Sequence, residues 1–266
     1  MIILHSGSFF DIMSHVSKIH FENEDVIMIN EKKVVALVPA AGMGVRMGNG
    51  TKKQFLKLGG LEILNWTLLK LWESEIIDEI IVIVPASDIN EVVIKIAKWQ
   101  ENTLSSTFTK VVLGGDTRQA SVYEGLKSVS KDFEIVVVHD GVRPFVPINQ
   151  LEEMCLQLAN YDGAVVAVRA TDTLKHVNET GVIIGTINRE FIWAVQTPQV
   201  FKLDTLLKAH AIGREQAILA TDDANLVENI GGKVLVVESQ KNNLKITTPF
   251  DLYVAQAILD VQGDGL

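Results

Sequence analysis

From Lys33 onward, short runs of β-branched and other apolar residues alternate with longer runs of helical period. This alternation constrains the fold more than any other feature, because a strand that is apolar along its whole length must be covered on both faces. Such runs lie at residues 34–40, 79–86, 110–114, 134–140, 163–170 and 233–238. Parallel strands joined by crossover helices satisfy both observations, so the sequence predicts an α/β fold.

The segments between these runs carry apolar residues near i, i+3, i+4 and i+7, which is the spacing of amphipathic helices. They lie at residues 61–74, 87–100, 117–130, 148–161 and 251–261. Helices of this kind can cover both faces of the sheet. We therefore expect a Rossmann-like three-layer sandwich with a mostly parallel sheet.

One segment, residues 171–199, breaks the alternation of strand and helix. Polar and apolar residues alternate there around a turn at Asn178 to Gly181, which is typical of a β-hairpin. We expect a protruding β-hairpin arm over about residues 171–192. A hairpin that is merely exposed to solvent is the simplest interpretation. Four of its side chains would nevertheless suit contact with phosphate: Thr173, Lys175, Arg189 and Thr197.

Composition limits the classes of partner. The chain has 266 residues, of which 47% are hydrophobic, and this is enough for one substantial core. A formal net charge of -9 and the lack of a dense Lys/Arg tract argue against nucleic acid as a partner. No apolar run approaches the roughly 18 residues needed to span a bilayer, so no membrane partner is expected.

Two further features concern location and organisation. Cys155 is the single cysteine, so no disulfide can form within the chain, and a reducing, cytoplasmic location is expected. Residues 1–32 lack a basic start followed by a continuous apolar core, and they do not predict a secretory signal. We treat them as an N-terminal extension of uncertain role and expect one domain over residues 33–262.

The first predicted strand runs into a loop of small residues, at the end of the strand where open α/β sheets bind ligands. The residues that would let the backbone approach a phosphate chain are Ala40, Ala41, Gly42 and Gly44. Arg46 adds positive charge. Met47 stands where the dinucleotide-binding fingerprint needs a glycine, and no Walker A sequence follows. Taken alone, an ordinary tight strand-to-helix turn explains this loop equally well.

The sequence Lys52-Lys53-Gln54-Phe55 follows this loop and precedes a predicted helix. A lysine pair in a loop is usually solvated surface. Here it is close enough to Arg46 in the chain for one lysine and the arginine to reach the same triphosphate. The combination of small-residue loop, arginine and Lys-Gln-Phe is more specific than any of its parts.

Together these residues resemble the nucleotide-sugar pyrophosphorylase-like superfamily and, more closely, the 2-C-methyl-D-erythritol 4-phosphate cytidylyltransferase family. The resemblance continues in order over roughly residues 33–260. The further blocks that carry it are Gly114 to Val122 with Asp116, Arg118 and Ser121, His139 to Phe145, Asp172 to Lys175, Gln196 to Gln199, Thr221 to Ala224, and Asn243 to Pro249. Lys52 departs from the pattern, since the family usually has proline there.

The resemblance implies a role for each block. The family's nucleotide-binding positions fall on Ala40, Ala41, Gly42, Gly44, Gly115, Asp116 and Ser121. Its catalytic positions fall on Arg46, Lys53 and Lys245, of which the first two grip the triphosphate. Its acceptor-binding positions fall on Asp140, Arg143, Thr173, Arg189 and Thr197. Asp140 is also the position beside the metal, which is Mg²⁺ or another divalent cation.

The activity that this resemblance implies is transfer of CMP from CTP to 2-C-methyl-D-erythritol 4-phosphate, a step of isoprenoid precursor synthesis by the non-mevalonate pathway. The acceptor phosphate is ionised near pH 7, so no general base is required, and His139 is expected to be structural. The family also implies a homodimer in which the arm reaches the neighbouring site.

Two other functions stay open at this point. A cytidylyltransferase acting on ribitol 5-phosphate would share most of these blocks. A non-catalytic nucleotide-binding module would tolerate the loss of Arg46, Lys53, Asp140 and Lys245, all of which are present. At single positions, Asp140 could instead stabilise a loop, and Lys245 could be a strand lysine that points into water.

Overall fold

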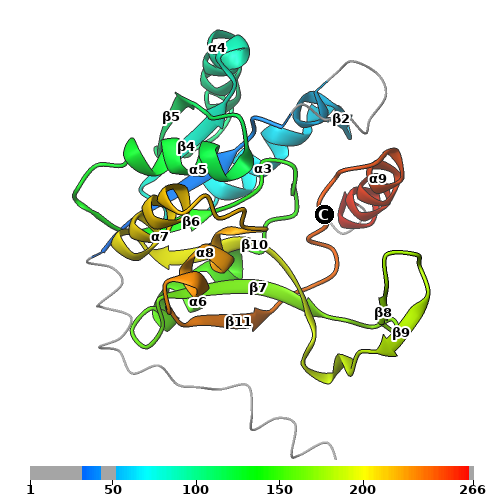
Figure 1. Cartoon of the computed structure of the whole chain (residues 1–266). Coiled ribbons are helices and arrows are strands. Elements are labelled where there is room, and N and C mark those ends of the chain that lie inside the picture. Colours follow the sequence, from blue (N-terminus) through cyan, green and yellow to red (C-terminus); the bar gives the residue numbers. More distant parts are fainter. Residues whose placement is uncertain (1–31, 43–51, 264–266) are drawn as a thin grey trace, which may run out of the picture.

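The computed structural model describes residues 32–42 and 52–263 (Figure 1). The strands in these ranges are β1 (Lys33–Pro39), β2 (Lys57–Leu58), β3 (Leu61–Glu62), β4 (Glu79–Val84), β5 (Phe108–Leu113), β6 (Phe133–Val138), β7 (Gly163–Arg169), β8 (Lys175–Val177), β9 (Ile183–Thr186), β10 (Trp193–Lys202) and β11 (Val234–Glu238). The α-helices are α3 (Ile63–Trp72), α4 (Ile89–Gln100), α5 (Arg118–Lys127), α6 (Leu151–Gln157), α7 (Leu203–Glu215), α8 (Asp223–Asn229) and α9 (Pro249–Gly263). Short 3₁₀ turns are η2 (Lys53–Phe55), η3 (Ala86–Asp88), η4 (Ile148–Gln150) and η5 (Arg189–Phe191). Within the described ranges, no helix combines the length and apolar character needed to cross a bilayer.

A seven-stranded sheet in the order β11-β7-β10-β6-β1-β4-β5 forms the centre of the fold. Neighbouring strands are parallel, except that β10 runs antiparallel to both β6 and β7. The predicted strands correspond to β1, β4, β5, β6, β7 and β11, each within a few residues of its predicted range. The prediction of an α/β fold with a mostly parallel sheet is confirmed.

The sequence did not predict β10. Its first residues, 193–199, fall inside the segment that was interpreted as a hairpin. Gln196, Thr197 and Gln199 interrupt the apolar run there, and the pairing of β10 with β7 shifts register between Val195 and Gln199. The hairpin interpretation was therefore wrong from residue 193 onward, where the chain returns to the middle of the sheet.

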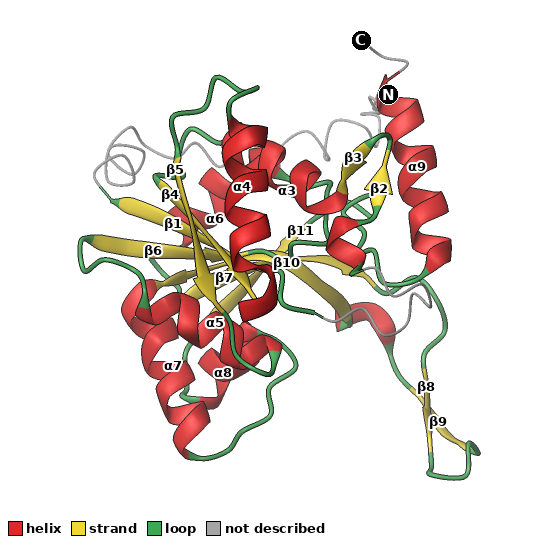
Figure 2. Cartoon of the chain, turned by 90° about the horizontal axis from the view of Figure 1, so that it is seen from above, coloured by secondary structure: helices red, strands yellow, loops and turns green. Residues whose placement is uncertain are grey.

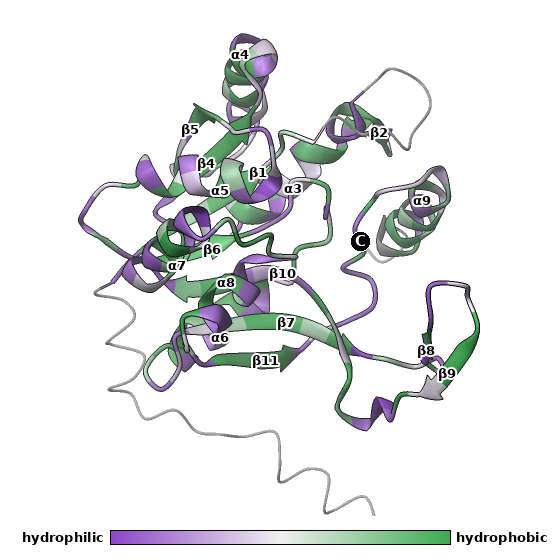
Figure 3. Cartoon of the chain, viewed as in Figure 1, coloured by the Kyte–Doolittle hydropathy of each residue, from purple (hydrophilic) through white to green (hydrophobic). Residues whose placement is uncertain are grey.

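Helices cover both faces of the sheet, as Figure 2 shows. Val34, Ala36 and Val38 of β1 pack on the face covered by α3, α4 and α6. Val35 and Leu37 point the other way and pack on the face covered by α5, α7 and α8. Apolar residues follow the strands in Figure 3, in keeping with burial of both faces. This is the predicted three-layer sandwich, although the sequence had not predicted α7 and α8.

Helix α9 does not lie on the sheet but packs against the small hairpin formed by β2 and β3 (Figure 2). A separate buried cluster forms there from Leu58, Ile63, Val142, Ile246 and Ala255. The backbone N–H of Ile246 donates to the carbonyl of Val142 at 2.9 Å. The chain just before α9 is therefore held against the loop that follows β6.

Strands β8 and β9 form a separate antiparallel hairpin that stands away from the sheet (Figure 1). Every residue of these two strands is exposed. Asn178 Oδ1 closes the turn by accepting from the backbone N–H groups of Thr180 at 3.1 Å and Val182 at 2.9 Å. Gly181 adopts a φ of +82°, a conformation that favours glycine. The predicted protruding arm is confirmed.

Candidate functional site

A cavity of about 390 Å³ opens at the carboxyl ends of β1 and β6. Its lining residues are Pro39, Ala40, Ala41, Gly42, Lys53, Gln54, Gly115, Asp116, Thr117, Arg118, Ser121, Asp140, Val142 and Lys245. From β1 the chain proceeds to β4 and β5 on one side of that strand, and β6 then pairs with its other side. The cavity therefore lies at the switch point of the sheet, where open α/β folds bind ligands.

Most of the predicted site residues meet in this cavity. Those that line it are Ala40, Ala41, Gly42, Lys53, Gly115, Asp116, Ser121, Asp140 and Lys245. Gly44 and Arg46 lie outside the described residues. Arg143 and Thr197 are buried and contact Asp140. Thr173 and Arg189 lie on the arm.

Two loops that contain small residues, one after β1 and one after β5, form two walls of the cavity. The buried amide of Gln54 donates from Nε2 to the carbonyl of Ala40 at 2.7 Å, which fixes the loop after β1. On the other wall, Ser121 Oγ donates to the carbonyl of Gly115 at 3.1 Å. A Cβ added to Gly115 would lie 2.6 Å from the Cβ of Ala120, so only glycine fits there. Both walls therefore present fixed backbone to a ligand.

Asp140, which follows β6, is surrounded by cationic side chains. Its Oδ1 accepts from Arg118 Nε at 3.0 Å, and its Oδ2 lies 2.8 Å from Lys245 Nζ and 3.6 Å from Arg143 Nε. Burial alone would raise the pKa of Asp140, but attraction to Arg118 and Lys245 outweighs it and holds the pKa well below its usual range. Asp140 is therefore ionised at neutral pH. Arg118 also pairs with the ionised Asp223 at 2.8 Å, so three cations face two carboxylates and leave an excess of positive charge, which favours phosphate.

A buried hydrogen-bond network supports Asp140 and Lys245. The backbone N–H of Asp140 donates to Thr197 Oγ1 at 3.0 Å. Arg143 Nη1 donates to the carbonyl of Asn243 at 2.7 Å, and Asn243 Nδ2 donates to the carbonyl of Thr197 at 2.9 Å. The network ties β10 and the segment before α9 to the end of β6. Lys245 is thereby placed beside Asp140, and the alternative that it points into water was wrong.

His139 precedes Asp140 but faces the interior. The ring is fully buried, and its Nε2 donates to the carbonyl of Arg143 at 3.0 Å. Burial lowers the pKa of His139 to about 4, so the imidazole is neutral at pH 7. His139 therefore supports the loop that carries Asp140 and Arg143 and brings no charge to the cavity.

The two neighbouring lysines after the small-residue loop have different surroundings. Lys53 begins η2 and lines the cavity. Lys52 Nζ forms an ion pair with the buried carboxylate of Asp88 and lies 3.2 Å from Ser87 Oγ, to which it donates. Lys52 thus joins η2 to η3, and only Lys53 faces the cavity.

Thr173 and Arg189 do not enter the cavity of their own chain. Both are exposed, and neither belongs to its lining. The guanidinium of Arg189 donates to the carbonyl of Thr171 at the base of the arm. Within one chain, the arm part of the predicted site is therefore separate from the cavity.

Comparison with known proteins identifies the family of the chain. The family model described as 2-C-methyl-D-erythritol 4-phosphate cytidylyltransferase matches residues 34–261. The chain belongs to this family. The proteins of that name from Desulforamulus reducens and Geotalea uraniireducens are 44% and 43% identical to the chain, over 85% of its length and 95% and 97% of theirs. A solved 4-diphosphocytidyl-2C-methyl-D-erythritol synthase from Anaerococcus prevotii matches with a TM-score of 0.76 and 31% identity, over 88% of this chain and 99% of that one.

Two of the lining residues that had been given no role from the sequence make contacts that support the site. Gln54 supports the loop after β1, and Arg118 bonds directly to Asp140. Both lie within blocks that carry the family resemblance, and Arg118 is an arginine two residues after Asp116, which was a usable signal. Its partner could not be found from the sequence, because Arg118 begins α5 whereas Asp140 lies in the loop after β6.

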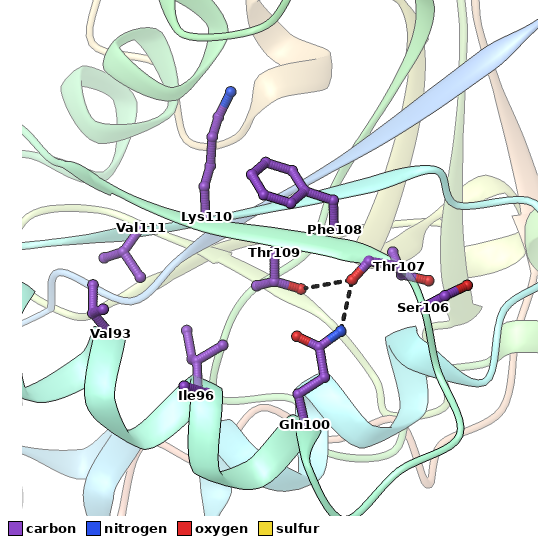
Figure 4. Close-up of a pocket in the computed structure, with 10 residues that line it drawn as sticks. Val93, Ile96, Gln100, Ser106, Thr107, Phe108, Thr109, Lys110 and Val111 are labelled. Atoms are coloured by element: carbon purple, nitrogen blue, oxygen red, sulfur yellow. Dashed lines mark hydrogen bonds between the residues drawn. The ribbon is translucent and has the colours of Figure 1, made fainter.

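A second hollow, of about 560 Å³, lies at the sheet edge between α4 and β5 (Figure 4). Apolar side chains in its lining include Val93, Ile96, Phe108 and Val111. Lys110 also belongs to the lining, but its Nζ forms an ion pair with Glu79 at 2.7 Å. This hollow lacks the excess positive charge found around Asp140. The chemistry of the cytidylyltransferase family therefore fits the cavity at the carboxyl ends of β1 and β6.

Proposed function

We infer that this chain transfers CMP from CTP to 2-C-methyl-D-erythritol 4-phosphate and releases pyrophosphate. The products are 4-diphosphocytidyl-2-C-methyl-D-erythritol and pyrophosphate, and the step serves isoprenoid precursor synthesis by the non-mevalonate pathway. One observation carries the proposal: an excess of positive charge surrounds Asp140 at the switch point of the sheet, in a chain of this family. A reaction between two phosphates needs such charge to overcome their repulsion.

In this proposal the nucleotide lies between the two small-residue walls. Backbone groups of these walls read the edge of the cytosine, and the positions concerned are Ala40, Ala41, Gly42, Gly115, Asp116 and Ser121. Lys53 holds the triphosphate from the start of η2. Arg46 shares that role on the strength of the family resemblance, and Gly44 belongs to the same loop.

The acceptor phosphate and the α-phosphate meet near Asp140. A phosphate monoester has a second pKa of about 6, so its attacking oxygen is already ionised near pH 7 and no base is needed. A new bond forms from that oxygen to the α-phosphorus, and the bond to the leaving pyrophosphate breaks. Lys245 supplies charge to the reacting phosphates. Arg143 and Thr197 bind the acceptor phosphate, as the family resemblance implies, and their buried hydrogen bonds also fix the loop. The lowered pKa of Asp140 suits it to hold cations in place and not to accept a proton.

A divalent cation, with Mg²⁺ as the first candidate, is part of this proposal. Among residues 32–42 and 52–263, no three His, Cys, Asp or Glu side chains gather as a metal site. Mg²⁺ is nevertheless commonly held by one or two carboxylates together with substrate phosphates, and the ionised Asp140 can offer one ligand. The residues present therefore fit the ion. When bound it would neutralise charge on the phosphate oxygens.

We also propose a homodimer in which each arm reaches the cavity of the neighbouring subunit. Arg189 and Thr173 are exposed on the arm and are absent from the cavity of their own chain. Large apolar side chains are exposed on the same arm, namely Val177, Val182, Ile183, Ile184, Ile187 and Phe191. Such a patch is unusual on a surface that stays solvated, and a second copy would cover it. Arg189 and Thr173 would then bind the acceptor phosphate across the interface.

The test is a pyrophosphate-release assay on the purified full chain with CTP, Mg²⁺ and either 2-C-methyl-D-erythritol 4-phosphate or ribitol 5-phosphate. We expect release with the methylerythritol acceptor and a much lower kcat/KM with ribitol 5-phosphate. Preference for ribitol 5-phosphate would reassign the acceptor. Binding of CTP without release from either acceptor would favour a non-catalytic nucleotide-binding module.

A further inference from the structure

We propose that Asp223 and His210, which lie outside the cavity lining, are positioning residues that act on the reaction through Arg118. This inference rests on the proposed function, because it concerns how the Asp140 centre is held during CMP transfer. Neither residue was assigned a role from the sequence.

The three side chains form a continuous chain of contacts that ends at Asp140. Arg118 uses Nε for Asp140 Oδ1 at 3.0 Å and Nη1 for Asp223 Oδ2 at 2.8 Å. The other oxygen of Asp223 accepts from His210 Nε2 at 2.9 Å, since an ionised carboxylate can only accept. Two carboxylates therefore hold one guanidinium at two points, which fixes the orientation of its plane.

The burial of Asp223 and His210 indicates what their contacts do. Asp223 and His210 are each only 1% exposed. Burial alone would raise the pKa of Asp223, but attraction to Arg118 and the hydrogen bond from His210 lower it overall, so a charged carboxylate is kept in the interior. Buried ion pairs of this kind contribute little net stability compared with apolar side chains of similar volume. The ion pair is therefore better explained by its effect on geometry, because it fixes the orientation of the Arg118 guanidinium.

Further contacts keep His210 itself in place. Its ring stacks on the ring of Tyr123, with centroids 6.2 Å apart and planes within 9° of parallel. Tyr123 and Arg118 belong to α5, His210 to α7 and Asp223 to the first turn of α8. The contacts thus join the three helices that cover one face of the sheet and extend from there to the cavity wall.

Without Asp223, Asp140 would be the one remaining partner of Arg118 among residues 32–42 and 52–263, in a region where Arg143 and Lys245 repel it. Rotation of Arg118 would release Asp140 Oδ1 and allow the carboxylate to turn. Lys245, which pairs with Oδ2 of the same carboxylate, would then lose its position beside the reacting phosphates. We therefore expect a loss in the chemical step and little change in the binding of CTP.

The experiment compares Asp223→Asn with Leu226→Ala in steady-state assays of the full chain. Asp223→Asn keeps the volume of the side chain but removes its charge, and we expect kcat to fall about tenfold or more while KM for CTP stays within about twofold. Leu226 is buried in the same helix, so its substitution lowers the melting temperature without touching Arg118. The control should keep a near-normal kcat at a temperature where it is folded.

A coupling measurement separates positioning from general damage to the fold. His210→Phe keeps a ring against Tyr123 but loses the hydrogen bond, and a fall in kcat of about threefold is expected. In an Arg118→Lys background, neither Asp223→Asn nor His210→Phe should lower kcat by more than about twofold further, because the residue through which they act is already changed. Additive losses in that background would overturn the proposal, as would wild-type kcat in both single variants or an equal loss in Leu226→Ala. Failure of the unmodified chain to form product would instead overturn the proposed function.

Discussion

The cavity and the arm hold their charged residues in opposite ways. In the cavity, Asp140 is 5% exposed and Arg143 is 9% exposed, and both have bonded partners in neighbouring elements. On the arm, Arg189 is exposed, and its guanidinium contacts only the carbonyl of Thr171 at the base of the same arm among residues 32–42 and 52–263. The cavity is assembled by the fold of one chain. The arm carries Thr173 and Arg189, but its own chain does not surround them with the partners that would fix their positions.

The two regions therefore need different things to fix their charged side chains. A catalytic charge contributes most when its position is fixed before the substrate arrives. The network from Thr197 through Asn243 to Arg143 provides that fixation in the cavity. The arm has no core of its own, so only contact with another surface can fix Arg189.

Removal of Lys245 should have the largest effect. Lys245→Ala is expected to lower kcat by about a hundredfold or more, since it deletes a preorganised charge beside the reacting phosphates. Lys70→Ala is a matched control, because Lys70 is a partly exposed lysine that pairs with Glu73. Steady-state kinetics and a melting curve measure both variants. Near-normal kcat in folded Lys245→Ala would break the account of the cavity.

The neighbouring lysines Lys53 and Lys52 allow a sharper comparison. Lys53→Ala is expected to reduce kcat/KM for CTP by about a hundredfold, because Lys53 faces the triphosphate. Lys52→Ala should change it by no more than about threefold, since Lys52 pairs with Asp88 away from the cavity lining. Equal losses in the two variants would show that Lys52 shares the triphosphate grip.

The start of the chain should have the smallest effect. The family match begins at residue 34, and we propose that residues 33–262 form the catalytic domain, so residues 1–32 take no part in turnover. A chain that starts at Met28 is expected to keep its kcat and melting temperature, to within about twofold and a few degrees. A large loss of either would make the N-terminal extension a working part of the enzyme.

The sequence predicted the sheet well and the supports of the site less well. Continuous runs of apolar residues identified β1, β4 and β6, because strands buried on both faces are apolar throughout. The same rule failed for β10, where Thr197, which bonds to Asp140, and Gln199, which bonds to Asp222, break the apolar run. A strand that carries functional polar residues loses the pattern by which strands are found.

Some of the site residues could be predicted from the sequence to lie together, and others could not. Ala40, Gly115 and Lys53 could be predicted to share a cavity, because loops at the carboxyl ends of parallel strands meet at one edge of a sheet. The pairing of Arg118 with Asp140 and Asp223 could not, since it depends on how α5 and α8 pack on the same face of the sheet. Sequence spacing limits which elements adjoin, but packing decides which charges touch.

Subunit mixing tests the contrast between cavity and arm most directly. Lys53→Ala and Arg189→Ala proteins, each inactive alone, are combined under conditions that exchange subunits. If Arg189 acts across a dimer interface, each mixed dimer contains one site with an intact Lys53 and an intact Arg189 from the neighbour. Random exchange makes half of the dimers mixed, and one of the two sites in each mixed dimer is intact. About a quarter of the wild-type activity should therefore return. Demonstrated exchange with activity that stays at the level of the parents would contradict the account, because every site would then carry a lesion from its own chain.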